Sequence, residues 1–344
     1  MQIGDLPRVR LANIPTPLQE ARRLTEAIGG PRILIKRDDL TGLAFGGNKT
    51  RILEFVMGDA VAKGTDVILA YAGWHSNWCS QVAAAAKKLG MDVILFKEAA
   101  KDGYDPEEYD GNQLLHFLLG ADIRAFSSGV KAVKAKEEAL RILKEEGRHP
   151  YDANRSPYAP IGYLNCMTET LSQANDMGIR IDYIVHAAGS GMTQSGLILG
   201  SLALNSGIKV LGISISSMED YQRKTAERVN ECAALLGLDI RVSERDVLVN
   251  GDYLTGGYGI IDESVVEAIK LLARTEGIFV DPVYTAKALA GLIDLARRGC
   301  FSKDDVVVFL HTGGIAGIFP YRGPIKALAQ SKPPPWKKPP WAPP

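Results

Sequence analysis

Apolar, β-branched runs alternate with helical patterns along most of this chain, and this alternation limits the possible folds more than any other feature. Helical segments separate the strand-like runs "RILIKRD", "TDVILAYAG", "MDVILFKE", "IDYIVHAAG" and "DVVVFLHTGG". Strands that alternate with helices form a parallel sheet with helices on both faces. The sequence therefore predicts an α/β fold, in which ligands bind beyond the carboxyl ends of the strands.

The order of these segments predicts two domains, which a chain of 344 residues can accommodate. We expect a smaller α/β domain over residues 50–165 and a larger one that combines residues 1–49 with 166–330. Residues 331–344 differ from both, because seven of these fourteen are proline, which helices and central strands do not tolerate. We expect this tail to be a loose extension or a docking arm.

Composition and charge exclude several classes of protein. Lys plus Arg equals Asp plus Glu at 40 each, and no basic block forms a nucleic-acid footprint. No run of 18 apolar residues exists to span a membrane, and the N-terminus lacks the apolar segment of a secretory signal. The four cysteines are scattered, which fits a reducing compartment and disfavours a cysteine-rich metal site. We expect a cytoplasmic protein without a metal site.

A glycine-rich turn lies between an apolar strand and an apolar helix in "VHAAGSGMTQSG", residues 185–196. Backbone N–H groups in such a turn, together with the helix N-terminus, bind anions such as phosphate. The turn is no dinucleotide fingerprint, because Gln194 stands where the third glycine belongs, and no nucleotide loop, because no lysine follows. A tight turn that binds nothing is the alternative.

A lysine stands at the start of a predicted helix in "LTGLAFGGNKTRILEF", residues 40–55. Considered alone, Lys49 is an ordinary solvated lysine of a first helical turn. A buried lysine amine, however, loses its proton more easily and can then attack a carbonyl. Together with a phosphate-binding turn, Lys49 indicates a cofactor that carries both an aldehyde and a phosphate, namely pyridoxal 5'-phosphate.

Five stretches resemble one enzyme family: "GGNKTRILEF", "HSN", "GSGMTQSGL", "EGIFVDPVYTAKALAGLIDLARRG" and "VVVFLHTGG". They are similar to the 1-aminocyclopropane-1-carboxylate (ACC) deaminase / D-cysteine desulfhydrase family, and the resemblance extends from about residue 8 to 325. It implies the tryptophan synthase β-like fold, called fold type II among pyridoxal-phosphate enzymes, with two open, twisted, mostly parallel sheets flanked by helices. It also implies a homodimer.

The resemblance implies catalytic roles for four residues. Lys49 matches the lysine that holds the cofactor and later moves the α-proton of the substrate. Ser76 matches a serine that contacts the substrate carboxylate, or acts on the substrate in ring-opening members. Tyr258 and Tyr284 match two tyrosines whose phenols face the substrate and can assist proton transfer. Without the resemblance, each tyrosine is better explained as a buried ring with a satisfied hydroxyl.

The resemblance also implies a set of residues around the cofactor. Asn77 matches the asparagine that hydrogen-bonds the ring hydroxyl, and Thr285 matches the residue beside the pyridine nitrogen. The expected cofactor-binding residues are Lys49, Asn48, Asn77, Gly189, Ser190, Gly191, Met192, Thr193, Thr285 and Thr312.

Two residues distinguish the activities within this family. Ring-opening deaminases are expected to have glutamate at the position of Thr285 and leucine at that of Thr312. A neutral residue beside the ring nitrogen makes the ring a weaker electron sink, which suffices when a good leaving group departs from the β-carbon. Both residues therefore favour β-elimination from a cysteine-like amino acid over the opening of a cyclopropane.

The substrate loop departs from the family pattern. In "HSNWCSQ", His75 replaces a glutamine, Trp78 replaces a histidine or glutamine, and Ser80 replaces an arginine. A second loop, "IGYLNCMTE", carries the bulky Tyr163 where the family has small polar residues. These side chains either reshape the pocket or pack between the domains, and a histidine there can also act as an acid, a base or a carboxylate partner. The expected substrate pocket consists of His75, Ser76, Trp78 and Tyr163.

The sequence thus predicts a pyridoxal-phosphate lyase that removes the α-proton of a small amino acid, with D-cysteine as the favoured substrate and a 2-oxo acid, ammonia and sulfide as products. One alternative is ACC deamination. A second is a β-replacement synthase, racemase or L-cysteate lyase with the same cofactor. A protein that binds the cofactor without turnover is disfavoured, because mere binding needs no phenols that face a substrate.

Overall fold

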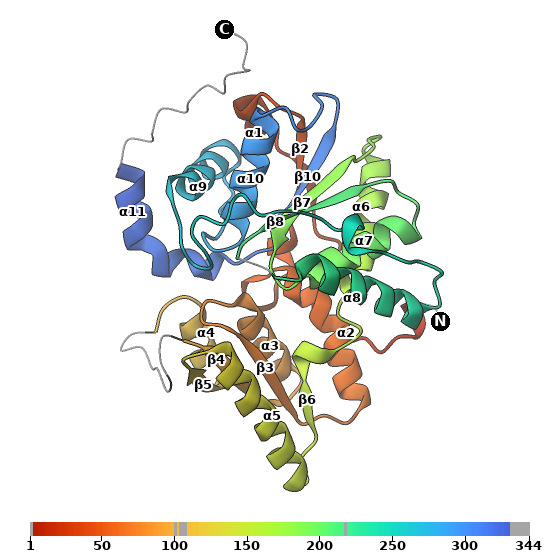
Figure 1. Cartoon of the computed structure of the whole chain (residues 1–344), viewed down its shortest axis with the longest axis vertical. Helices are drawn as coiled ribbons and strands as arrows, with labels where there is room; N and C mark the ends of the chain where they lie inside the picture. Colours follow the sequence, from red (N-terminus) through yellow and green to blue (C-terminus); the bar gives the residue numbers. More distant parts are fainter. Residues whose placement is uncertain (1–2, 100–101, 103–108, 217–218, 331–344) are drawn as a thin grey trace.

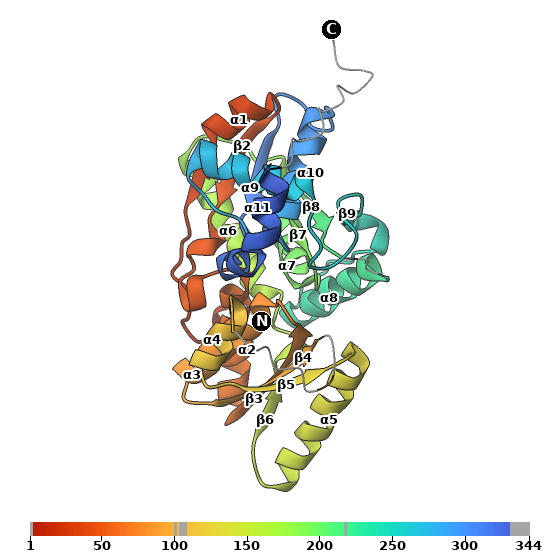
Figure 2. The same cartoon turned by 90° about the vertical axis from the view of Figure 1, so that its left-hand side faces the viewer.

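The chain folds around two mostly parallel sheets, seen in a computed structural model that describes residues 3–99, 102, 109–216 and 219–330. The larger sheet occupies the upper half of the molecule and the smaller sheet the lower half (Figures 1 and 2). The proline-rich segment 331–344 lies outside the described residues. Within the described residues, no helix combines the length and the apolar character that a membrane crossing requires.

In the described part of the chain, the larger sheet has six strands in the order β1-β2-β10-β7-β8-β9. All neighbours are parallel except the antiparallel pair β1 and β2. Its strands are β1 (Leu18–Glu20), β2 (Arg32–Lys36), β7 (Tyr183–Ala188), β8 (Lys209–Ser214), β9 (Leu248–Asn250) and β10 (Val306–Leu310).

Helices cover both faces of the larger sheet, as expected when crossovers join parallel strands (Figure 1). One face holds α1 (Arg22–Ile28), α9 (Glu263–Glu276) and α10 (Thr285–Arg297). The other holds α6 (Ile161–Asp176), α7 (Met192–Ala203) and α8 (Tyr221–Leu236). The last helix of the described chain, α11 (Arg322–Gln330), packs against α9.

The smaller sheet has four parallel strands in the described chain, in the order β5-β4-β3-β6. Helix α5 (Gly129–Glu145) covers one face, while α3 (Asn77–Lys88), α2 (Asn48–Ala62) and α4 (Asn112–Leu118) lie on the other side (Figure 2). Its strands are β3 (Val67–Gly73), β4 (Asp92–Glu98), β5 (Asp122–Phe126) and β6 (Pro150–Asp152).

Helix α2 lies between the two sheets and is buried almost all round. Its residues 50–60 are all buried, and Phe55 packs in one apolar cluster with Val82 of α3 and Met167 of α6. The polar side chains of this helix that are buried with it, such as Arg51 and Glu54, are paired with other polar groups. This packing fixes the first turn of α2, which carries Lys49, with respect to both sheets.

The predicted α/β fold with two mostly parallel sheets is confirmed. The four strands of the smaller sheet lie between residues 67 and 152, inside the range 50–165 expected for the smaller domain. Strand β6 forms at residues 150–152, and α6 begins at Ile161. The domain boundaries themselves remain predictions.

Candidate active site

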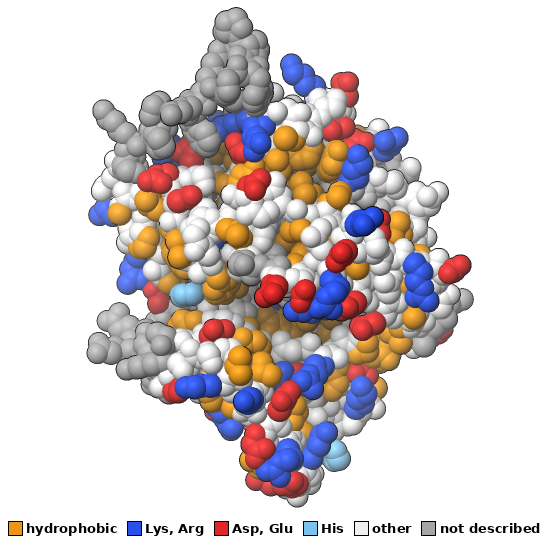
Figure 3. Space-filling model, viewed as in Figure 1, with side chains coloured by type: hydrophobic (Ala, Val, Ile, Leu, Met, Phe, Trp, Pro, Cys, Tyr) orange, Lys and Arg blue, Asp and Glu red, His pale blue; other side chains and the backbone are white. Residues whose placement is uncertain are grey.

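A cavity of about 960 Å³ opens where the carboxyl ends of strands from both sheets meet. Figure 3 shows this face of the molecule hollowed between its upper and lower halves. The structure brings fourteen of the expected site residues together around this cavity: Asn48, Lys49, His75, Ser76, Asn77, Trp78, Gly189, Ser190, Gly191, Met192, Thr193, Tyr258, Tyr284 and Thr312.

Several residues that line the cavity escaped sequence reasoning. They gave no signal because no motif marks them and each reaches the cavity only through tertiary packing. They include Tyr71, Glu98, Asn154, His186, Ile215 and Tyr221.

Lys49 lies in the first turn of α2 and faces the cavity. Two contacts anchor this turn: the Asn48 N–H donates to the carbonyl of Thr312 at 3.0 Å, and Gly47 forms a bridge with Gly313. Within the described residues, the Lys49 amine has neither an acceptor nor a carboxylate partner. Burial therefore acts unopposed and lowers the pKa of Lys49 to about 8. A substantial fraction of this amine is neutral near physiological pH and able to attack an aldehyde.

We expect Lys49 of the cofactor-free protein to react with an amine-directed acylating reagent with a midpoint near pH 8. Exposed lysines as a class titrate near ~10.4. The labelled fraction of the Lys49 peptide, followed by mass spectrometry against pH, measures this directly. A midpoint above pH 10 would show that the amine is solvated.

The glycine turn after β7 has the geometry of an anion site. Gly191 has a φ of 83°, which favours glycine, and a Cβ there would meet the Thr225 hydroxyl at 2.6 Å. Within the described residues, the N–H groups of 190–193 have no acceptor, as expected at the start of the twelve-residue helix α7. Asn48 Nδ2 donates to Thr193 Oγ1 at 2.9 Å, which ties this turn to the helix of Lys49.

The N-terminus of α3 forms another wall of the cavity. Ser76 caps this helix, because its hydroxyl oxygen accepts a hydrogen bond from the Trp78 N–H at 3.1 Å. The capping role leaves the Ser76 hydroxyl proton available to a ligand. Trp78 is 6% exposed and packs into the central core, so only part of it meets the cavity. Burial, assisted by Lys97, lowers the pKa of His75, which makes His75 a neutral ring at pH 7.

The two expected tyrosines meet in the cavity. Their hydroxyls are 2.6 Å apart, and burial raises the pKa of both Tyr258 and Tyr284. Asp281 positions Tyr284 by accepting hydrogen bonds from the N–H groups of 283–285, which begins α10. Lys287 fixes the loop before Tyr258, because its amine donates to the carbonyls of Leu254 and Gly257.

Two expected site residues do not line the cavity. Thr285 is fully buried, and its hydroxyl donates to the carboxylate of Asp281 at 2.7 Å. Tyr163, expected in the substrate pocket, is fully buried in α6 and donates to Asp38 at 2.6 Å. The prediction for Tyr163 is wrong because α6 begins two residues earlier and turns this side chain into the protein.

We expect Tyr163→Phe to lower the free energy of unfolding by about 1–3 kcal/mol, since a buried acceptor of Asp38 loses its donor. Turnover is expected to stay at the level of the unchanged protein. Thermal unfolding and an activity assay on the same sample check both statements. Lower turnover at unchanged stability would show that Tyr163 does belong to the substrate pocket.

The cavity fits pyridoxal phosphate on observations of this structure. Among residues 3–99, 102, 109–216 and 219–330, nothing accepts from the N–H groups of 190–193, which can bind the phosphate, or from the Lys49 amine, which can bind the aldehyde. The N–H groups and the amine lie in the same cavity. The hydrogen bond from Asn48 to Thr193 fixes the glycine turn relative to the helix that carries Lys49. The tyrosine pair stands in the remaining space, where a substrate would bind.

Comparisons with known proteins agree with this chemistry. The pattern of the family described as "Pyridoxal-phosphate dependent enzyme" matches residues 9–313. An ACC deaminase from Burkholderia cenocepacia is 36% identical over 334 residues, which covers 94% of this chain and 98% of that protein. A Pyrococcus abyssi protein to which the same activity is provisionally assigned is 39% identical over 325 residues, covering 93% and 95%.

Solved structures show the same fold. A crystal structure described as that of an ACC deaminase homologue has a TM-score of 0.86 at 39% identity, covering 95% of this chain and 97% of that one. The processed form of threonine deaminase isoform 2 from Solanum lycopersicum has a TM-score of 0.62 at 17% identity, covering 92% and 84%, and supports the fold alone. Fold type II and the pyridoxal-phosphate cofactor are both confirmed. This chain belongs to the family of pyridoxal-phosphate dependent enzymes, among homologues of ACC deaminase.

Proposed function

We propose that this chain is a deaminating lyase that removes the α-proton of a small amino acid and releases its nitrogen as ammonia. The observation that carries the proposal is the position of Lys49, whose amine has no partner in the described part of the chain and lies in the same cavity as the glycine turn and the tyrosine pair. Pyridoxal phosphate supplies an electron sink that stabilises the negative charge left when the α-proton departs.

The chain's own residues divide the work in this proposal. The amides of 190–193 hold the phosphate, and Asn77 binds the ring hydroxyl. Lys49 would hold the aldehyde of the cofactor, and its amine, when free of that bond, would take the α-proton of the substrate. Ser76 and the first turn of α3 bind the substrate carboxylate, since a helix N-terminus favours an anion.

The tyrosine pair is assigned to proton delivery at the β-position. With raised pKa values both phenols keep their protons at pH 7, and one can donate to a leaving group while the other holds it in place. We expect Tyr284→Phe to lower turnover by about 100-fold or more while the visible spectrum of the bound cofactor persists. Tyr183→Phe is the matched control, because Tyr183 begins β7 and is not among the residues that line the cavity. Equal turnover in both variants would remove Tyr284 from the mechanism.

D-Cysteine is the first substrate we propose, with water converting it to pyruvate, hydrogen sulfide and ammonia. Thr312 lines the cavity and Thr285 is buried with its hydroxyl on Asp281, so neither position offers the charged side chain that a strong electron sink needs. This supports elimination of a good leaving group, for which a weak electron sink suffices. ACC is the second candidate, because relatives at 36–37% identity carry the name ACC deaminase. The α-carbon of ACC bears no proton, so with this substrate ring opening would take the place of α-proton removal. The proposal also includes a homodimer in the cytoplasm.

A panel of four compounds separates these candidates. The purified protein with its cofactor is offered D-cysteine, L-cysteine, L-cysteate and ACC, and ammonia, 2-oxo acid, sulfide and sulfite are measured. We expect equal amounts of sulfide, pyruvate and ammonia from D-cysteine. Ammonia and oxo acid from ACC alone would establish ring opening instead, and four inert compounds would overturn the substrate proposal.

A further inference from the structure

Helix α4 turns a buried polar face towards the loop that joins β3 to α3. Asn112, Gln113 and His116 share one side of this helix, and each is at most 5% exposed. Gln113 Nε2 donates to the carbonyl of Trp74, and Lys97 Nζ donates to the same carbonyl at 2.6 Å. Polar groups are buried in this way only when their hydrogen bonds are made. The loop between β3 and α3 is therefore fixed by side chains, Gln113 and Lys97, that do not line the cavity.

The hydrogen bonds of Asn112 fix which end of its amide faces the loop. Its Nδ2 lies 3.1 Å from the carbonyl oxygen of His75 and 2.8 Å from Oδ1 of Asn77. A backbone carbonyl can only accept, so the amide nitrogen of Asn112 must point at it. On the other side, the Ser80 hydroxyl donates to Asn112 Oδ1 at 2.9 Å and lies 2.9 Å from His116 Nε2, which completes the chain.

This orientation determines what Asn77 presents to the cavity. Because Asn112 offers a donor, the atom of Asn77 that meets it must be the carbonyl oxygen. The Nδ2 of Asn77 is therefore turned the other way, beside Gly314, where a Cβ on that glycine would come within 3.0 Å of it. Within the described residues this Nδ2 has no acceptor, while Asn77 lines the cavity. This amide nitrogen is thus a donor that a ligand in the cavity can use.

We propose that Asn112 is a positioning residue that holds Asn77 in the orientation in which its amide donates to the ring oxygen of the cofactor. This inference rests on the proposed function, in which Asn77 faces that oxygen. A donor favours the ionised ring hydroxyl, whereas the carbonyl of a flipped amide would repel it. Ser80, which stands where relatives were expected to have arginine, serves here to anchor Asn112.

The test replaces the donor of Asn112 without changing its shape. Asn112→Asp cannot donate to Asn77 or to the His75 carbonyl, and Asn112→Ala removes the donor without adding a charge. We expect either variant to weaken cofactor binding about 10- to 100-fold, the range for one hydrogen bond to a charged group. We also expect the visible band of the bound cofactor to titrate at a higher pH, because its ring oxygen ionises less readily. Asn175→Asp, the same change at an exposed position, is the matched control.

A double-mutant cycle shows whether Asn112 acts through Asn77. Cofactor affinity is measured for Asn77→Ala with and without Asn112→Asp, and we expect the second change to have no further effect once Asn77 is gone. An unchanged pH midpoint and affinity in both Asn112 variants would overturn the inference while leaving the proposed function intact. A wild-type protein that shows no cofactor band would overturn the proposed function itself, and this inference with it.

Discussion

Replacing Lys49 with alanine is expected to remove the covalent attachment of the cofactor and to lower turnover by about 100- to 10,000-fold, the range that one positioned proton carrier supplies. The Lys49 amine is unpaired within the described residues, and burial lowers its pKa to about 8. The same nitrogen can therefore both bind the cofactor and carry the proton. The phosphate turn over 190–193 is untouched by this change. The variant should therefore still bind pyridoxal phosphate, reversibly and more weakly.

The control for this experiment is Lys88→Ala, which removes an exposed lysine from α3. Dialysis, absorbance spectra and the substrate panel are applied to both variants and to the unchanged protein. The proposed role of Lys49 would be wrong if its variant retained the cofactor through dialysis and turned over substrate like the control.

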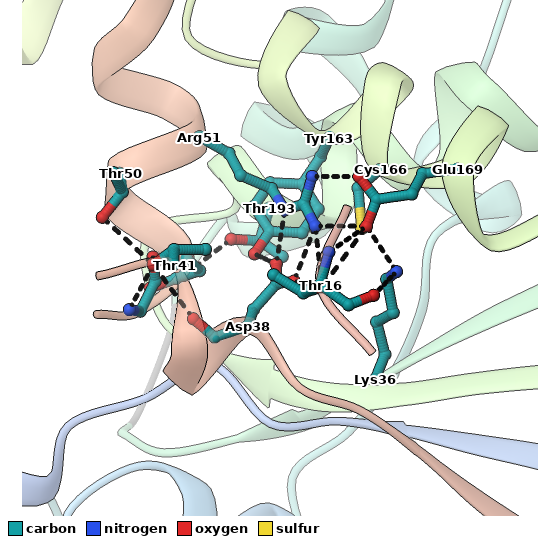
Figure 4. A network of polar contacts seen from close by, with 12 residues as sticks. Thr16, Lys36, Asp38, Thr41, Thr50, Arg51, Tyr163, Cys166, Glu169 and Thr193 are labelled. Carbon is teal, nitrogen blue, oxygen red and sulfur yellow. Dashed lines mark hydrogen bonds and ion pairs between the residues drawn. The ribbon is translucent and has the colours of Figure 1, made fainter. Parts of the chain in front are cut away.

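Replacing Arg51 with methionine is expected to lower the free energy of unfolding by about 3–5 kcal/mol, the cost of leaving buried charges without a partner. Figure 4 shows the cluster in which Arg51 lies. Arg51 makes two hydrogen bonds of 2.9 Å to Asp38 and two of 2.8–3.0 Å to Glu169. Lys36 completes the cluster with a 2.5 Å contact to Glu169, so that two cations balance two anions in a buried setting.

The stability that Arg51→Met loses should depend on pH, and the direction of this dependence identifies Asp38 as the cause. Burial alone would raise the pKa of Asp38, but its ion pair with Arg51 holds that pKa below the usual value. Once Arg51 is gone, the hydrogen bond from Tyr163 and the charge of Lys36 still oppose burial, but we expect the carboxyl of Asp38 to titrate above its unfolded value. The folded variant then binds more protons than the unfolded chain, so its stability rises as the pH falls. We expect the deficit against the unchanged protein to be largest near pH 7 and smaller in acid.

Arg180→Met is the matched control, because the Arg180 side chain is 88% exposed and its ion pair with Asp182 lies at the surface. Exposed pairs of this kind contribute about 0–1 kcal/mol. Urea denaturation of both variants at pH 5 and pH 7 gives the comparison. Equal midpoints for the two variants would mean that the buried cluster does not stabilise the fold.

The cluster also matters for the active site, because its member Arg51 lies two residues after Lys49 in α2. Arg51 connects α2 to Asp38 after β2 and to Glu169 of α6, while Thr50 Oγ1 donates to Gln81 of α3 at 2.8 Å. These contacts join the helix of Lys49 to elements of both sheets. The position of the reactive amine is thus set by polar groups that never meet the cavity.

Much of the fold could be predicted because its longer elements carry strong periodicity. The apolar strands β3, β4 and β10 and the alanine-rich α3 follow the sequence patterns within a few residues. Three strands escaped, because β1, β6 and β9 have only three residues each, which is too few to establish an alternation.

The candidate site was less accessible from sequence than the fold. The glycine turn and Lys49 could be connected by chemistry alone, but the roles of Ser76, Tyr258 and Tyr284 came from the resemblance to a family. Tyr163 was misassigned because its partner Asp38 is 125 residues away in sequence, and no local pattern records such a contact. The link between Asn112 and Asn77 joins residues 35 apart and was invisible for the same reason.

The most direct test of the account is to locate the cofactor bond. The purified protein with bound pyridoxal phosphate is treated with borohydride, digested and examined by peptide mass spectrometry. We predict a single reduced pyridoxyl phosphate group on Lys49, with loss of the visible band. A pyridoxyl group on another lysine, or none at all while the protein remains active, would contradict the account.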